Sequence, residues 1–119
     1  MHLPEKYVAI LLVTVVMNLI GSLGARSQTV FSVKYKSDAQ VKVFVAQYKS
    51  DADLVVYKAQ YKSDADGNNG IWFFTDYQSD AKKKIFFVDY KSDADLIIFF
   101  SDYKSDAGWL NKSKQQLMY

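Results

Sequence analysis

A repeat of thirteen residues dominates this sequence. The segment Tyr-Lys-Ser-Asp-Ala occurs five times, and a sixth copy has Gln78 in place of the lysine. Thirteen residues separate consecutive tyrosines, except for sixteen at the middle of the array. A unit this short holds one strand and one tight connector, with no room for a crossover helix, so ordinary βαβ winding is disfavoured. The copies begin at Tyr35, Tyr48, Tyr61, Tyr77, Tyr90 and Tyr103.

The segments before the tyrosines are rich in β-branched and aromatic residues, which predicts strands. Large apolar residues stand both four and five positions before each tyrosine, as Val43 and Phe44 do before Tyr48. Neighbouring residues on a strand point to opposite faces, so both faces of most strands should be covered. Strands are predicted at residues 41–46, 54–58, 71–74, 85–88 and 96–100.

The repeated pentapeptide is expected to be the connector. Its Ser and Asp are typical of a short helical turn or a tight turn. We expect its Tyr and Ala to pack inward as structural residues, with Lys and Asp solvated; a charge array that binds a partner is the alternative. The sixteen-residue spacing contains Gly-Asn-Asn-Gly at 67–70, a composition that predicts a longer loop.

The N-terminus has the order of a secretory signal peptide. A short polar start with Lys6 precedes an apolar run at 7–20 and then small residues at 21–25. Residues 1–24 are therefore predicted to be cleaved, leaving one secreted, extracellular domain at 25–119 without stable membrane insertion. An uncleaved anchor is the alternative, but the run is shorter than the about 20 residues that span a bilayer.

Composition excludes the commonest catalytic sites. The chain has no Cys, and its single His is His2, within the predicted signal peptide. The Ser-His-Asp, Cys-His and common zinc constellations therefore cannot form, and neither an enzyme nor a cofactor is expected. A carboxylate hydrolase is the weakest alternative, with Asp76 and Asp89 as its least implausible residues. Lys and Asp are interleaved along the chain, which argues against nucleic-acid binding.

Two short motifs suggest sites. Asp64, Asp66 and Asn68 alternate as ligands do in a calcium loop, but the twelfth position is Thr75 instead of the bidentate Glu, so a plain turn is favoured over a weak cation site. Asn111-Lys-Ser is an N-glycosylation acceptor pattern, and it is as readily an unmodified loop.

Three features together carry a family resemblance: the strand followed by Tyr-x-Ser-x-Ala-Asp, the break at 66–74, and the ending Ala-Gly-Trp-Leu-Asn-Lys-Ser at 107–113. The chain resembles a domain-of-unknown-function family of short repeat proteins, with bacterial members and secreted insect members. It departs from that family at Asp38 and Asp51, where Gln is common. The resemblance implies no activity, and it implies a deeply knotted topology.

The expected fold is β-rich mixed α/β, a single compact domain of six strand-plus-turn repeats that the resemblance suggests is knotted. The expected function is that of a secreted, non-catalytic module that binds an extracellular protein or glycan. Weak cation binding and carboxylate hydrolysis are the alternatives.

Overall fold

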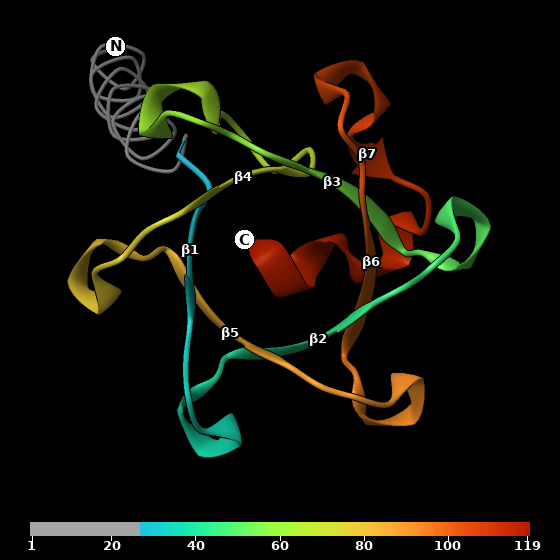
Figure 1. The fold of residues 1–119 in the computed structure, drawn as a ribbon, viewed down its shortest axis with the longest axis horizontal. Helices are drawn as coiled ribbons and strands as arrows, with labels where there is room; N and C mark the ends of the chain where they lie inside the picture. The colour runs from blue at the N-terminus through green and yellow to red at the C-terminus, as the bar shows by residue number, and fades with distance from the viewer. Residues whose placement is uncertain (1–26) are drawn as a thin grey trace, which may run out of the picture.

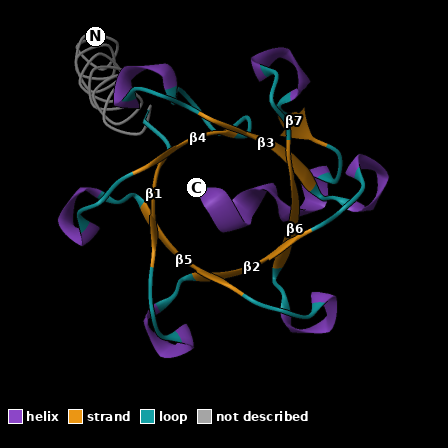
Figure 2. Ribbon diagram, in the orientation of Figure 1, coloured by secondary structure: helices purple, strands orange, loops and turns teal. Residues whose placement is uncertain are grey.

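The computed structural model describes residues 27–119, which form six long strands, a short seventh and seven 3-10 helices (Figure 1). Strands and connectors alternate strictly, as Figure 2 shows. The strands are β1 (Thr29–Ser32), β2 (Val41–Val45), β3 (Leu54–Lys58), β4 (Ile71–Phe74), β5 (Lys83–Phe87), β6 (Leu96–Phe100) and β7 (Gly108–Trp109). The 3-10 helices are η1 (Lys36–Asp38), η2 (Lys49–Asp51), η3 (Lys62–Asp64), η4 (Gln78–Asp80), η5 (Lys91–Asp93), η6 (Lys104–Asp106) and η7 (Lys112–Met118).

The first six strands close into a parallel barrel in the order β1, β5, β2, β6, β3, β4 and back to β1. One hydrogen bond recurs around the ring. In each repeat, the residue two positions before the connector tyrosine donates its backbone N–H to the neighbouring strand. The acceptor is the carbonyl of the residue that lies five positions before the tyrosine of that neighbouring repeat. Val33 donates to Ile85 at 2.8 Å in this way, and Thr75 donates to Val30 at 2.9 Å. A closed ring leaves no open edge among these six strands.

Strands that are consecutive in sequence are not neighbours, except at one step. The chain moves two places around the barrel from β1 to β2 and from β2 to β3, one place from β3 to β4, and then two places at each later step. We call β1 to β3 with η1 to η3 the first lap, and β4 to β6 with η4 to η6 the second lap. The strands of the two laps therefore alternate around the barrel (Figure 1).

The single short step coincides with the sixteen-residue spacing. Three steps of two places return to the starting place in a ring of six, so a third equal step, from β3, would direct β4 to the place of β1. The loop at 67–70 instead puts β4 directly beside β3, where the Tyr57 N–H donates to the Gly70 carbonyl at 2.8 Å. The insertion thus shifts the second lap into the gaps left by the first.

The barrel is strongly sheared. Between neighbouring strands, equivalent positions of the repeat are displaced by two residues. Val30, five positions before its tyrosine, pairs with Lys83, seven positions before its own, and Ile85 pairs with Val41 with the same displacement. Two residues at each of six interfaces give a shear of 12 for six strands. High shear tilts the strands and widens a barrel of given strand number, which explains how so few strands enclose the fully buried Trp72.

The interior is filled in rings whose side chains alternate in size. The residue five positions before each tyrosine is fully buried in all six repeats, and it is Val throughout the first lap but Ile or Trp in the second. Because the laps alternate in space, large and small side chains interdigitate around the ring, as dense packing requires. In order around the barrel this middle ring is Val30, Ile85, Val43, Ile98, Val56 and Trp72.

The connectors share one geometry, but their tyrosines do not pack inward. Each tyrosine is extended, its carbonyl accepts the N–H of the connector Asp, and the Lys or Gln carbonyl accepts the N–H of the Ala, as in Tyr35 to Ala39. The six tyrosine side chains are 62–70% exposed, so the expectation of inward packing is wrong for them. The connector alanines are buried or half-buried, which agrees with that expectation.

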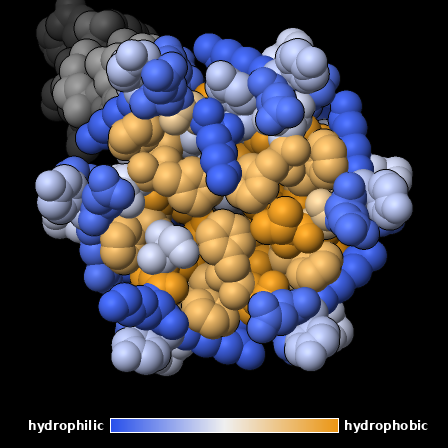
Figure 3. All heavy atoms as spheres, viewed as in Figure 1, coloured by the Kyte–Doolittle hydropathy of each residue, from blue (hydrophilic) through white to orange (hydrophobic). Residues whose placement is uncertain are grey.

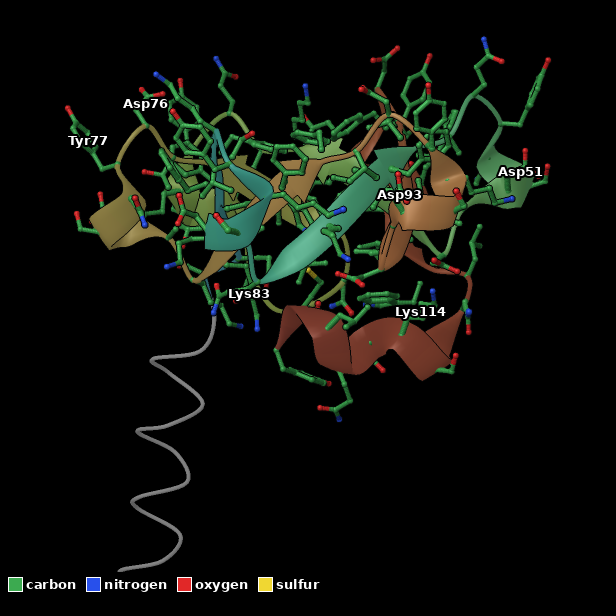
Figure 4. The ribbon with its side chains drawn as sticks, turned by 90° about the horizontal axis from the view of Figure 1, so that it is seen from below. Asp51, Asp76, Tyr77, Lys83, Asp93 and Lys114 are labelled. Atoms are coloured by element: carbon green, nitrogen blue, oxygen red, sulfur yellow. The ribbon has the colours of Figure 1, made fainter. Side chains whose placement is uncertain are left out.

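The helix η7 closes the end of the barrel where the strands begin (Figure 4). Met118 is fully buried in the core, and its carbonyl accepts a hydrogen bond from the buried Gln28 side chain at 3.2 Å. The C-terminal segment, although mostly polar in sequence, therefore contributes to the core. β7 runs antiparallel along the first half of β3 and leads into η7.

The predicted strands are all present, and β1 and β7 add to them. The β-rich, single-domain part of the expected class is confirmed, whereas the α/β part is not, because every helix within residues 27–119 is a 3-10 helix. No helix in this part of the chain is long and apolar enough to cross a membrane. The predicted signal peptide and its cleavage point lie outside the described residues.

Gly70 provides a test of the step between β3 and β4. A Cβ at Gly70, whose φ is +87°, would overlap the Val55 carbonyl oxygen, whereas one at Gly67, whose φ is +71°, would lie 3.4 Å from the Asn69 side chain. We expect Gly70→Ala to lower the free energy of unfolding by roughly 3 kcal/mol or more, because steric overlap adds to backbone strain.

Gly67→Ala is the matched control, since it carries the strain without the overlap, and about 1 kcal/mol is expected. Urea denaturation of both variants measures the difference. Equal losses in the two variants would contradict this account of the short step.

Candidate functional site: the aromatic mouth

The barrel end opposite η7 is open and aromatic. Six residues, each three positions before a connector tyrosine, ring this end, and we call them the mouth. Figure 3 shows hydrophobic side chains across the centre of this face and hydrophilic groups around its rim. In order around the barrel the mouth is Ser32, Phe87, Val45, Phe100, Lys58 and Phe74.

The three mouth phenylalanines all come from the second lap and form one cluster. Phe74 lies at its centre, with ring centroids 6.5 Å from Phe87 in a stacked arrangement and 6.2 Å from Phe100 in a tilted one. Trp72 supports the cluster from below, 6.1 Å from Phe74. The phenylalanines are half-buried and pack on the core, so the aromatic surface is held rigidly.

One cation lies over this cluster. The Lys58 Nζ is 4.4 Å from the centroid of the Phe100 ring and 5.5 Å from that of Phe74. The electron-rich faces of the rings attract the ammonium, which thereby stays above an apolar surface. The mouth therefore presents two ring faces, a hydrogen-bond donor and a positive charge within a few ångströms.

The rim of the mouth is polar. The connectors project outward around it, and Tyr77 points away from the barrel (Figure 4). A hollow of about 240 Å³ lies between the first and fourth connectors, where Phe31, Tyr35 and Asp38 of one repeat face Gln78 of another. Aromatic faces beside hydroxyl, amide and carboxylate groups thus continue from the mouth onto the outer wall.

The opposite end carries structural polar contacts instead. Asp53 is a half-buried residue whose carboxylate accepts the Ile97 N–H at 2.9 Å and the Asn111 side-chain N–H at 3.2 Å. The Lys114 ammonium lies 3.7 Å from it. Asp95 likewise accepts the Lys42 N–H at 2.9 Å. These carboxylates serve the backbone donors at the start of neighbouring strands and tie η7 to the barrel.

Near this end, Lys82 lines a hollow with Thr29 and Asp80. Burial lowers the pKa of Lys82 below its usual range, and the ammonium of Lys83 lowers it further. The Lys82 Nζ donates to the Gln28 side-chain oxygen at 3.4 Å. The hollow is thus tied to the packing of the buried Gln28.

The candidate cation residues differ in their exposure and hydrogen bonding. Asp64 and Asp66 are exposed, whereas Asn68 is buried. The Asn68 side-chain amide donates to the Gln115 carbonyl at 3.1 Å, and the Asn68 backbone carbonyl accepts the Trp109 indole N–H at 2.7 Å. Among residues 27–119 no group of three His, Cys, Asp or Glu side chains is placed to hold a metal ion. The geometry makes Asn68 a structural link between the long loop and η7.

Asn111 stands at the N-cap of η7. Its side-chain oxygen accepts the Ser113 hydroxyl at 2.6 Å and the Ser113 N–H at 3.3 Å, while its amide nitrogen donates to Asp53. Glycosylation of this residue stays a prediction. The hydrogen bond to Asp53 gives its amide a structural role as well.

Asp76 and Asp89, the candidate hydrolase residues, are exposed and lie before η4 and η5. Because β4 and β5 lie on either side of β1, the connector of β1 separates the two carboxylates around the rim. The fold does not bring them together as a pair.

Sequence reasoning missed the mouth, although a signal was present. The position three residues before each tyrosine is Phe throughout the second lap but Ser, Val or Lys in the first. That difference points to a site only when the two laps are known to alternate in space, and the spacing of the repeats does not reveal it.

These features define a closed, interlaced barrel of repeats. Residues 27–110 match the family described as the 7(1) septoil knot domain, and the chain belongs to this family. The resemblance to a family of knotted repeat proteins is confirmed, and the two-lap path agrees with the knot in the family's description. The match ends at Leu110, before η7. Comparisons with curated proteins and with solved structures gave no match.

The contrast between Asp53 and a connector aspartate is testable. Asp53→Ala leaves the Ile97 and Asn111 donors without their acceptor and loosens η7, so we expect a loss of roughly 2 kcal/mol in the free energy of unfolding. Asp51→Ala changes an exposed connector carboxylate and should stay within about 0.5 kcal/mol of the parent. Chemical denaturation compares them, and a loss as large for Asp51→Ala would refute the distinction.

Proposed function

We propose that this protein is a secreted, non-catalytic binding module and that its aromatic mouth binds a glycan. The observation that carries the proposal is the Lys58 ammonium held over the Phe74 and Phe100 rings at the open end of the barrel. Sugars have an apolar face of C–H groups and a periphery of oxygens. The mouth offers a surface for each part, since the rings pack against the C–H face and Lys58 donates to an oxygen.

The size of the patch favours a glycan over a protein as the ligand. The cluster consists of three rings whose neighbouring centroids are 6.2 and 6.5 Å apart, a span comparable with one or two sugar rings. A stable protein interface buries about 800 Å² on each partner, which would need the polar rim as well. The rim hydroxyl and carboxylate groups suit the remaining oxygens of a glycan.

The non-catalytic part of the proposal depends on the available chemistry. The described residues have neither His nor Cys, and the carboxylates are distributed over the connectors or engaged with backbone donors. A glycosidase needs two carboxylates across one bond, and the mouth has none among its six residues. Binding without turnover is therefore the activity that these side chains favour.

The extracellular part depends on the sequence of residues 1–24. An immunoblot of cells and medium after expression of the full chain tests it. A shortened product in the medium is expected, and a full-length product retained in membranes would overturn it.

Binding is tested by screening the protein against a glycan array and measuring hits by calorimetry. We expect saturable binding that weakens at least tenfold in Lys58→Met and in Phe100→Ala, because each removes one half of the recognition surface. Phe44→Ala, a half-buried residue at a strand position that faces outward, is the matched control and should bind as the parent does. Circular dichroism checks that each variant is folded.

The absence of any glycan hit would contradict the proposal, as would hits that are insensitive to both mouth variants. Binding of secreted proteins alone, abolished by the same variants, would replace the glycan with a protein as the ligand.

A further inference from the structure

The six connector tyrosines are alike in structure but not in their sequence neighbours. Tyr77, Tyr90 and Tyr103 of the second lap are 69%, 70% and 70% exposed, and the tyrosines of the first lap are 62–68% exposed. Every second-lap tyrosine directly follows an exposed aspartate, whereas the first-lap tyrosines follow lysine or glutamine. The preceding residues are Asp76, Asp89 and Asp102 in the second lap, and Lys34, Gln47 and Gln60 in the first.

The backbone at these tyrosines is suitable for an enzyme that acts on the hydroxyl. Each of the three is extended, with φ of −118°, −122° and −114° at Tyr77, Tyr90 and Tyr103. The side chain of Tyr77 projects into solvent from the rim (Figure 4). An acidic residue follows at the third position after each tyrosine, at Asp80, Asp93 and Asp106.

We propose that Tyr77, Tyr90 and Tyr103 are sites of tyrosine O-sulfonation in the secretory pathway, an inference that depends on the secretion proposed above. A transferase that binds an anionic sulfonate donor has a basic active site, so an aspartate beside the tyrosine favours binding and a lysine opposes it. The same hydroxyl with the same exposure is thus a substrate in one lap and not in the other.

The reaction is a sulfonate transfer. The phenolic oxygen attacks the sulfur of phosphoadenylyl sulfate, the bond from sulfur to the donor's bridging oxygen breaks, and the adenosine bisphosphate leaves. The phenolic proton passes to a base of the transferase. The product is an aryl sulfate that carries one permanent negative charge.

The three sites should not react equally. Tyr77 is followed by Gln78, whereas Tyr90 and Tyr103 are each followed by a lysine. Near Tyr103, the Asp106 carboxylate also accepts the Ser101 hydroxyl at 2.8 Å and lies 3.9 Å from the Lys49 ammonium. The negative charge beside Tyr77 is therefore the least offset by neighbouring lysines, and Tyr77 should be the first site modified.

Because the laps alternate, three sulfates would occupy every second connector around the mouth. Exposed charges are screened over about 8 Å at physiological salt, so each would act as a separate anionic point on the rim. A basic partner with matching spacing could engage several of them at once.

The experiment uses the full chain, expressed in a sulfating eukaryotic secretory cell line with radioactive sulfate in the medium. Peptide mass spectrometry should find sulfonate on Tyr77 above all, then on Tyr90 and Tyr103, and none on Tyr35, Tyr48 or Tyr61. Asp76→Asn should lower the labelling of Tyr77 at least fivefold. Gln47→Asp should create labelling at Tyr48, a gain that loss of folding cannot imitate.

A secreted chain without sulfonate on any second-lap tyrosine would overturn the inference, and so would equal labelling of both laps or a modification removed by phosphatase. If the chain is retained in cells, the secretion proposal fails by itself. A purified tyrosylprotein sulfotransferase with phosphoadenylyl sulfate then decides the inference on the full chain, with the same expected order of sites and the same contradicting outcomes.

Discussion

The whole structure depends on closing a ring of six parallel strands with a repeat too short to contain a crossover helix. Each connector except the one between β3 and β4 carries the chain past one strand of the other lap, and equal steps throughout would fill only every second place in the barrel. The three additional residues between Tyr61 and Tyr77, with Gly70 against the Val55 carbonyl, change one step and let the second lap enter the gaps. Within the barrel, every strand then hydrogen-bonds on both sides to strands of the other lap, including β3 to β4, where the laps meet in sequence, and β4 to β1.

Because the two laps alternate around the barrel, residue types that differ between the laps also alternate around it. The first lap supplies small side chains to the middle ring and the second supplies Trp72, Ile85 and Ile98, so the interior packs without six large groups at one level. The same alternation puts Phe74, Phe87 and Phe100 at the mouth and an aspartate before every second rim tyrosine. Core packing, the proposed glycan surface and the proposed modification sites all follow from one division between the laps.

Local chemistry made much of this predictable. β-branched and aromatic residues identified the strands, the paired apolar positions indicated two covered faces, and Gly-Asn-Asn-Gly marked the long loop. The pairing of β1 with β5 was not predictable. Backbone hydrogen bonds form between any two strands whatever their side chains, and a thirteen-residue spacing is compatible with either neighbouring or interlaced strands. The exposure of the tyrosines was also not predictable, because an aromatic residue in every repeat suggests burial, whereas the short 3-10 connectors project it outward. Nor did a polar C-terminal segment reveal that Met118 would seal the core.

The strand order is most directly tested by disulfide formation in a chain that has no cysteine of its own. Phe31 and Lys84 are partners across β1 and β5, within the range that a disulfide bridges, whereas Phe31 and Phe44 are equivalent positions of consecutive repeats separated by β5. Mass spectrometry of mildly oxidised double-cysteine variants should find the cross-link in Phe31→Cys/Lys84→Cys and not in Phe31→Cys/Phe44→Cys. A cross-link in the second variant and none in the first would mean that consecutive repeats are neighbours, and it would contradict the two-lap barrel.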